Sequence, residues 1–170
     1  LALAQSTRKD MIVSPEWLAA HPDVVVLDIA NRDSFAKGHI PGARFVDLQS
    51  IVTERDGTPN EVPDTATLES AFRAAGVGDH ERIVVYSRDP LFAARAWFTL
   101  DYLGQGHRTS YLDGGFARWT DEGRPVATEV TPVKPAAFRA SVRAKALTNL
   151  DEMRSLVKWR NELASDLAMI

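Results

Sequence analysis

Two stretches decide the fold of this 170-residue chain: Gly38-His39-Ile40-Pro41-Gly42-Ala43 and Leu112-Asp113-Gly114-Gly115-Phe116-Ala117-Arg118-Trp119. Between them an apolar run of strand length ends at Tyr86 and leads through a short loop, residues 87–92, into a helical pattern. Each stretch alone is weak evidence. Their order and separation, with a strand, a loop and a helix between them, make the combination specific.

Strand and helix patterns alternate outward from these stretches. Continuous apolar runs at residues 24–28 and 83–86 are typical of strands buried on both faces, and shorter strands are expected at 43–46 and 110–112. Helices are expected in the intervals: after the N-cap Ser14, at 32–37, after a Thr65 cap, at 92–103 and at 114–122. This alternation predicts an α/β fold in three layers, with a central parallel sheet flanked by helices.

The carboxyl ends of the strands are where a site is expected. In open parallel sheets, ligands bind beyond those ends. Asp28, the loop that begins at Ser87, and Asp113 are all predicted to lie there.

This layout resembles the rhodanese (thiosulfate sulfurtransferase) family over residues 12–126, about two thirds of the chain. The resemblance implies one rhodanese-like domain at residues 11–127. Residues 48–63, predicted to be a long polar loop, resemble an insert in the first half of two-domain sulfurtransferases. In those proteins two such domains lie in tandem, and usually only the second carries the cysteine. The family's structural motifs fall here on Asp28, Gly38, His39, Pro41, Gly42, Asp113, Gly114 and Gly115.

The resemblance also implies a defective active loop. Active domains read Cys-Arg-x-Gly-x-Arg directly after the strand. Here Ser87 takes the cysteine position and Arg88 matches the first arginine, but Pro90 stands for the glycine and Phe92 for the second arginine. Sulfur transfer needs a thiolate, and a serine hydroxyl is far too weakly acidic to replace it unless a base activates it.

Other residues of the loop Ser87-Arg88-Asp89-Pro90-Leu91-Phe92 also disfavour catalysis. Pro90 removes an N–H group from the cradle that would hold an anion. Phe92 removes a cation, and Asp89 adds a charge of the wrong sign. Because three defining positions differ at once, the sequence indicates a naturally silent loop with no catalytic residue. Arg88 and Arg95 remain as candidate anion contacts, although solvated or ion-paired roles are favoured for both.

The other polar candidates have structural interpretations. His39 in its Pro41-Gly42 turn is favoured as a structural residue over a catalytic one. Asp28 and Asp113 could bind a cation or an active-site group, but bonding to backbone donors is favoured. Gly114-Gly115 is too short for a phosphate loop and lacks the Lys-Ser/Thr that would follow it. Isolated histidines give no metal-ligand spacing, so no metal or cofactor is implied.

The composition excludes some classes of partner and of chemistry. The net charge is −3 with scattered basic residues, and no apolar run approaches about 20 residues, so neither nucleic acid nor a membrane is predicted as a partner. The chain has no cysteine, which excludes disulfides and thiol catalysis within it. Ala2-Leu3-Ala4 resembles the end of a signal peptide, or is a flexible leader, which leaves the cytoplasm and export both open.

The C-terminal part differs in character. Residues 128–147, with Thr131-Pro132-Val133-Lys134-Pro135, are expected to be an extended linker. Residues 148–170 are expected to be either the start of a second rhodanese-like domain or a C-terminal extension. Asn149-Leu150-Asp151-Glu152-Met153 resembles the opening of its first helix, and Leu167-Ala168-Met169-Ile170 its first strand.

Three hypotheses about function follow. The chain is the silent half of a tandem sulfurtransferase, with a catalytic rhodanese domain of the same longer chain, or another copy of this chain, as its partner. Alternatively, it is a stand-alone module that binds a protein or an anion. The third hypothesis, an enzyme with Ser87 as nucleophile, requires a base that the sequence does not place nearby.

Overall fold

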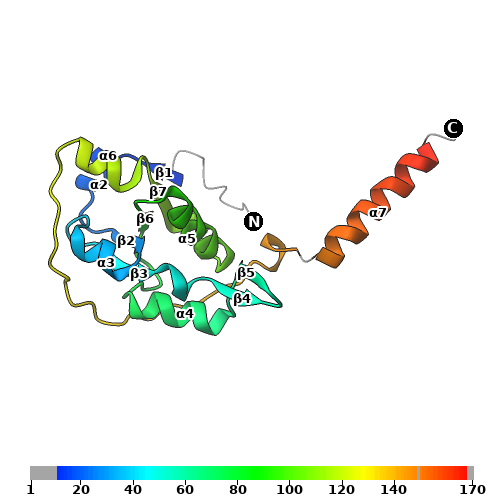
Figure 1. Ribbon diagram of the computed structural model, residues 1–170, viewed down its shortest axis with the longest axis horizontal. Helices are drawn as coiled ribbons and strands as arrows, with labels where there is room; N and C mark the ends of the chain where they lie inside the picture. Colours follow the sequence, from blue (N-terminus) through cyan, green and yellow to red (C-terminus); the bar gives the residue numbers. More distant parts are fainter. Residues whose placement is uncertain (1–10, 149, 168–170) are drawn as a thin grey trace.

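A five-stranded parallel sheet forms the centre of the molecule in the computed structural model, which describes residues 11–148 and 150–167 (Figure 1). The strand order is β1-β7-β6-β2-β3, and every neighbouring pair is parallel. The strands are β1 Ile12–Val13, β2 Val25–Ala30, β3 Arg44–Asp47, β6 Ile83–Tyr86 and β7 Thr109–Leu112. The predicted α/β class and parallel sheet are confirmed.

Helices cover both faces of this sheet. They are α2 Pro15–Ala19, α3 Arg32–Lys37, α4 Thr65–Ala74, α5 Pro90–Tyr102 and α6 Gly115–Asp121. Single 3₁₀ turns are η1 Leu48–Ser50, η2 Gly106–Arg108 and η3 Ala144–Ala146. Alternate residues of β2 enter different cores, as the two-residue period of a strand requires. One core joins β2 to α4 and α5, and the other joins it to α2, α3 and α6. The predicted three layers are therefore present.

Local capping explains where the helices begin. Ser14 accepts a hydrogen bond from the Trp17 amide at 3.1 Å, as predicted. The cap of α4 is Asp64 rather than the expected Thr65, because the Asp64 carboxylate accepts from the Thr67 amide. Helix α5 begins at Pro90, two residues earlier than predicted, since Asp89 caps it.

Residues 48–63 are more ordered than the long loop that the sequence predicts. They contain η1 and an antiparallel hairpin of β4 Thr53–Arg55 and β5 Thr58–Glu61. The hairpin turns at Asp56-Gly57, where both residues have positive φ angles of 51° and 74°. Asp-Gly is a common pair for such a turn, but the strands are too short and polar to be recognised from their pattern.

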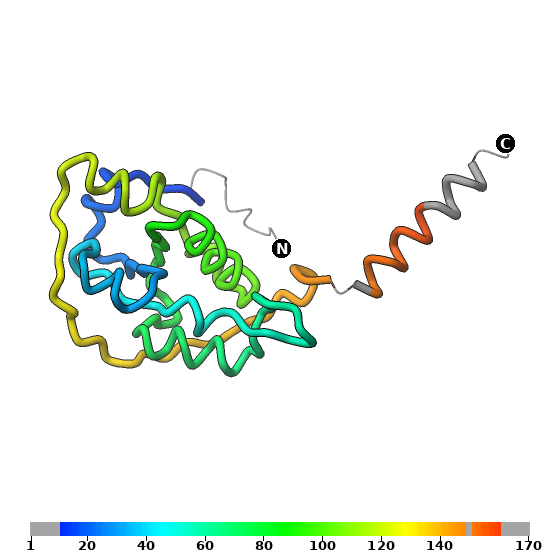
Figure 2. Tube along the Cα trace, in the orientation of Figure 1, coloured from blue at the N-terminus to red at the C-terminus, as the bar shows by residue number. Residues whose placement is uncertain are grey.

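The domain core extends further along the chain than Ala127. Residues 128–143, hereafter the strap, form no helix or strand but run back along the domain past α4 (Figure 2). Phe138 is fully buried in the core beside Phe72, with ring centroids 5.4 Å apart. The Arg73 side chain donates to the Phe138 carbonyl at 3.0 Å. The segment predicted to be a linker is thus an integral part of the packed domain up to this point.

Helix α7, Leu150–Leu167, follows the strap and extends away from the domain (Figure 1). It includes the expected helix opening at Asp151–Met153. Of the residues expected to form a strand at 167–170, Leu167 belongs to α7, and Ala168 to Ile170 lie outside the described residues. Between residues 151 and 160 every side chain is exposed, including the large apolar side chains of Met153, Leu156, Val157 and Trp159. No described helix is both long and apolar enough to cross a membrane.

Candidate functional site

The loop from Ser87 to Phe92 lies at the carboxyl end of β6, where the sequence predicts it. Strand β6 is flanked by β2 and β7, so the loop emerges near the middle of the sheet edge. Ser87 is only 5% exposed. Gly115 has a φ angle of +55°, and a Cβ atom there would lie 2.6 Å from the Ser87 carbonyl oxygen. The start of α6 therefore packs directly against the loop because this residue is glycine.

The Ser87 hydroxyl is committed to structural hydrogen bonds. It donates to the Ile29 carbonyl at 2.6 Å and accepts from the Asp89 amide at 3.2 Å. Among the described residues no side chain that could serve as a base is hydrogen-bonded to it. The hydroxyl therefore ties the loop to β2 rather than standing free as a nucleophile.

The amide groups that begin α5 are occupied by atoms of the loop itself. The Asp89 amide donates to Ser87 Oγ, and the Leu91 amide donates to the Asp89 carboxylate at 2.9 Å. Pro90 has no N–H group, and the Phe92 amide donates to the Asp89 carbonyl at 3.1 Å. A helix N-terminus binds an anion through free amides of this kind. The loop thus caps its own helix and leaves no amide of residues 89–92 for a ligand.

Arg88 and Arg95, the two candidate anion contacts, hold loop carbonyls instead. Arg88 donates to the Gly38 carbonyl at 2.7 Å, and its guanidinium lies 3.9 Å from the centroid of the Phe116 ring. Arg95 donates to the Glu61 carbonyl at 2.8 Å, and burial lowers its pKa from the usual value. Neither arginine forms an ion pair with another described residue; Arg88 is solvent-exposed, whereas Arg95 is half-buried.

A buried carboxylate lies beneath the loop. Asp28 is the fourth of six residues in β2 rather than the residue after the strand, and it is 2% exposed. The apolar run ends before the strand does, because Ile29 and Ala30 continue the pairing with β3. The Tyr86 hydroxyl donates to Asp28 Oδ2 at 2.9 Å and accepts from the Ile40 amide at 2.9 Å. Asp28 thus reaches the backbone only through Tyr86, not directly as expected.

Burial raises the pKa values of both Asp28 and Tyr86. The loss of water raises the pKa of Asp28 to about 6, although the Tyr86 hydrogen bond and the positive charge of Arg88 oppose the rise. Burial and the nearby carboxylate also raise the pKa of Tyr86 well above its usual value. The second oxygen, Asp28 Oδ1, is buried and has no hydrogen-bond partner. The sequence does not single out Tyr86, although the parallel neighbours β2 and β6 place it beside Asp28.

The His39 side chain is enclosed. It is 1% exposed, its ring stacks on Phe35 at 3.8 Å, and its Nδ1 lies 2.9 Å from the Phe35 carbonyl. The His39 amide donates to the Ala127 carbonyl, and the Ala127 amide donates to the His39 carbonyl. The Ala43 amide donates to the Ile40 carbonyl around Pro41-Gly42, a turn in which Gly42 has a φ of +77°. These contacts give His39, Pro41 and Gly42 structural positions.

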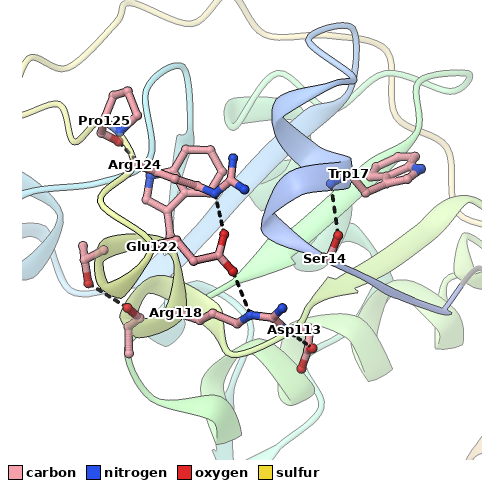
Figure 3. A network of polar contacts seen from close by, with 10 residues as sticks. Ser14, Trp17, Asp113, Arg118, Glu122, Arg124 and Pro125 are labelled. Carbon is pink, nitrogen blue, oxygen red and sulfur yellow. Dashed lines mark hydrogen bonds and ion pairs between the residues drawn. The ribbon is translucent and has the colours of Figure 1, made fainter.

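Asp113 belongs to a surface network at α6 (Figure 3). It forms an ion pair with Arg118, which also contacts Glu122 at 3.0 Å, and Glu122 contacts Arg124 at 2.7 Å. These side chains are 22–55% exposed and lie at the surface, so the network contributes little stability. The Asp113 carboxylate thus pairs with a side chain rather than with the backbone donors that were expected. Gly114, the next residue, has the left-handed conformation with a φ of 70°. Within residues 11–148 and 150–167, no cluster of His, Asp and Glu could hold a metal ion.

Removal of the Ser87 hydroxyl tests its structural role. We expect Ser87→Ala to lower the free energy of unfolding by about 1 kcal/mol. The variant loses the hydroxyl's bond to the Ile29 carbonyl and its bond from the Asp89 amide. Urea denaturation measures this change, and Ser70→Ala, an exposed serine on α4, is the matched control. Equal stability of the two variants would show that the Ile29 bond contributes nothing.

The fold and the loop together define the class. This is a three-layer α/β domain. At the carboxyl edge of its sheet, β6, the loop at residues 87–92 and α5 form a strand–loop–helix unit whose amides bond to atoms of the loop itself. The chain belongs to the rhodanese-like domain family: the sequence profile of that family matches residues 14–122.

Similar proteins are named as sulfurtransferases. The chain is 32% identical to thiosulfate sulfurtransferase of Bos taurus over 164 residues, covering 84% of this chain and 54% of the relative. It is 34% identical to thiosulfate sulfurtransferase of Azotobacter vinelandii over 124 residues, covering 71% of this chain and 45% of the relative. The structure of SseA from Escherichia coli, described as a 3-mercaptopyruvate sulfotransferase, is 27% identical with a TM-score of 0.75. That comparison covers 84% of this chain and 59% of SseA. The chain thus spans about half the length of the curated relatives it matches.

Proposed function

We propose that this chain is a catalytically silent rhodanese-like domain. In this proposal it forms one half of a two-domain sulfurtransferase of the thiosulfate or 3-mercaptopyruvate type, and the other half carries the cysteine. The observation that carries the silent role is the loop at residues 87–92. No thiol follows β6, and the loop's own atoms take the amides that would stabilise an anion there.

Two further observations support the tandem arrangement. The chain corresponds to about half of relatives that are named as sulfurtransferases. Helix α7 also presents Met153, Leu156, Val157 and Trp159 to water. Leaving a large apolar side chain exposed forgoes about 1.5–3 kcal/mol relative to burial. A second domain that begins at α7 would bury this surface.

The encoding gene and the native polypeptide test this arrangement. We expect the reading frame to continue past Ile170 into a second rhodanese-like domain with a cysteine directly after a strand. The native protein, detected in its source cells by an antibody against this domain, should have about twice the 18.7 kDa of this chain. A native product of 18.7 kDa would refute the half-enzyme and favour the second candidate.

That second candidate is a stand-alone protein-binding module. One observation favours it: Leu91 is 74% exposed on the silent loop, where it presents an apolar side chain. The same loop argues against an anion as its ligand, because its amides are occupied. The Ser87 nucleophile hypothesis is disfavoured, since the hydroxyl donates to a carbonyl rather than to a base.

Introducing a thiol at position 87 tests whether the chain is inactive only because it lacks a cysteine or also because the amides of the loop are occupied. We expect neither the unmodified chain nor Ser87→Cys to form thiocyanate from thiosulfate and cyanide above the uncatalysed rate. In the variant, Pro90 still lacks an amide, Asp89 still occupies the Leu91 amide, and its carboxylate opposes both a thiolate and an anionic donor. Alkylation of the introduced thiol under denaturing conditions, with an unchanged circular dichroism spectrum, confirms that the variant is folded and carries a thiol. Turnover by Ser87→Cys would show that the serine alone silences the loop.

A further inference from the structure

A half-open polar cavity lies between the strap and the domain. Its volume is about 320 Å³, and it lies between the Pro41-Gly42 turn, the glycine that ends α4, and strap residues 131–134. Pockets of this size accept small ligands. This cavity shares no residue with the loop at residues 87–92.

The two charged residues that line the cavity are both cations. Arg44 contributes from the start of β3 and Lys134 from the strap, while the other lining residues are uncharged: Gly42, Ala43, Gly76, Thr131, Pro132 and Val133. In the described part of the chain neither cation forms an ion pair. The whole chain has a net charge of −3, so a cavity lined by cations without an acid departs from its general character.

Gly76 brings the two cationic elements together. A Cβ atom at Gly76 would lie 3.1 Å from Arg44 Nη1 and 2.9 Å from the Lys134 carbonyl oxygen. The φ angle of Gly76 is +71°, and the same Cβ atom would collide with Val133 at 2.3 Å. The strap can therefore pass this close to the guanidinium only because residue 76 is glycine.

The Arg44 guanidinium has hydrogen-bonding capacity to spare. It is half-buried and its one hydrogen bond to the described residues goes to the Gly76 carbonyl. A guanidinium has five N–H donors in a planar fork, and phosphate-type oxyanions match that fork. Lys134 is solvent-exposed at the rim of the cavity, so its flexible side chain can reach an anion that Arg44 holds.

We propose that Arg44 and Lys134 form a binding site for a tetrahedral oxyanion of the phosphate or sulfate class. The anion accepts hydrogen bonds from the guanidinium on β3 and from the ammonium on the strap. Binding therefore fastens the strap to the domain and stabilises the folded state.

Thermal unfolding of the whole chain tests the site. With inorganic phosphate about ten times above its Kd, the midpoint should rise by about 3–6 °C more than in sodium chloride of equal ionic strength. Lys134→Gln removes one cation without breaking a hydrogen bond within the described residues, and we expect it to abolish this excess. Arg44→Gln should do the same. The control is Lys145→Gln, an exposed cation in η3 outside the cavity, which should keep the full excess.

The controls decide between a site and a general salt effect. Kosmotropic anions stabilise many proteins by exclusion from their surfaces, and that effect would be the same in all variants. An equal rise in Lys134→Gln and the unmodified chain, or no excess in the unmodified chain, overturns the proposal. A parallel titration with glycerol phosphate identifies the source: an equal excess assigns a phosphate ester, and its loss assigns the free oxyanion.

Discussion

Replacing Phe138 with alanine is expected to lower the free energy of unfolding by about 3–5 kcal/mol, the usual cost of removing a buried phenylalanine. Phe138 is fully buried and contacts Phe72 of α4, although it lies in a segment without helix or strand. A loss of this size is a large fraction of the roughly 5–15 kcal/mol that stabilises a typical domain. The strap would then be as necessary to the fold as the helices.

Urea denaturation measures the change, and Val130→Ala provides the matched control. Val130 lies in the same strap but is 61% exposed, so its truncation should be nearly neutral. Phe138→Leu, which keeps more apolar volume, should lose less and remains measurable if the alanine variant does not fold. A loss under about 1 kcal/mol for Phe138→Ala would contradict the packed position of the strap.

Replacing Asp28 with asparagine is expected to change how stability depends on pH. The pKa of Asp28 in the folded state is about 6, raised from 3.8 by burial. Below about pH 4 the carboxyl is protonated in both the folded and unfolded states, so no ionisation cost applies. Between about pH 4 and 6 the unfolded state ionises while the buried carboxyl of the folded state stays protonated, so the folded state loses stability by about 1.36 kcal/mol per pH unit. The total loss is about 3 kcal/mol and is complete once the pH has risen through 6.

The measurement is the free energy of unfolding of both proteins from about pH 4 to pH 8. The stability of Asp28→Asn relative to the unmodified chain should rise by about 3 kcal/mol over this range, because asparagine does not ionise. Asp64→Asn should change little over this range and should differ in the opposite direction below it. The Asp64 pKa is lowered by hydrogen bonds from Thr67, so its ionised form stabilises the folded state and that stability is lost as the pH falls. A flat difference for Asp28→Asn would show that Asp28 is not a buried, ionisable group.

The fold was largely predictable because its signals are local. Continuous apolar runs marked β2 and β6, and caps such as Ser14 marked helix starts. Strand β1 has only two residues and was missed, since so short a run has no recognisable period. Phe138 was missed for a different reason. Its neighbours are Pro135, three alanines and Arg139, which form no recognisable strand or helix pattern. Its burial results from contacts with α4, more than sixty residues earlier, which no local pattern records.

The place of the candidate site was predictable, but its detail was not. Compared with the active loop of the resembled family, the residues at 87, 90 and 92 predict a silent loop. That the loop satisfies its own amides depends on backbone geometry, which the sequence does not specify. Asp28 was expected directly after its strand, because the apolar run of β2 stops there. The strand continues for two residues because Ile29 and Ala30 pair with β3, and this pairing buries Asp28.

The strap also affects how this domain is made in the cell. Arg73 and the Phe138 carbonyl, which bond to each other, are 65 residues apart in the chain, so α4 leaves the ribosome well before the segment that covers it. At a synthesis rate of about 5–20 residues per second, the apolar face around Phe72 waits several seconds for Phe138. During that interval the nascent chain exposes part of its core and is open to chaperones. The domain core can close only after the strap has emerged from the ribosome.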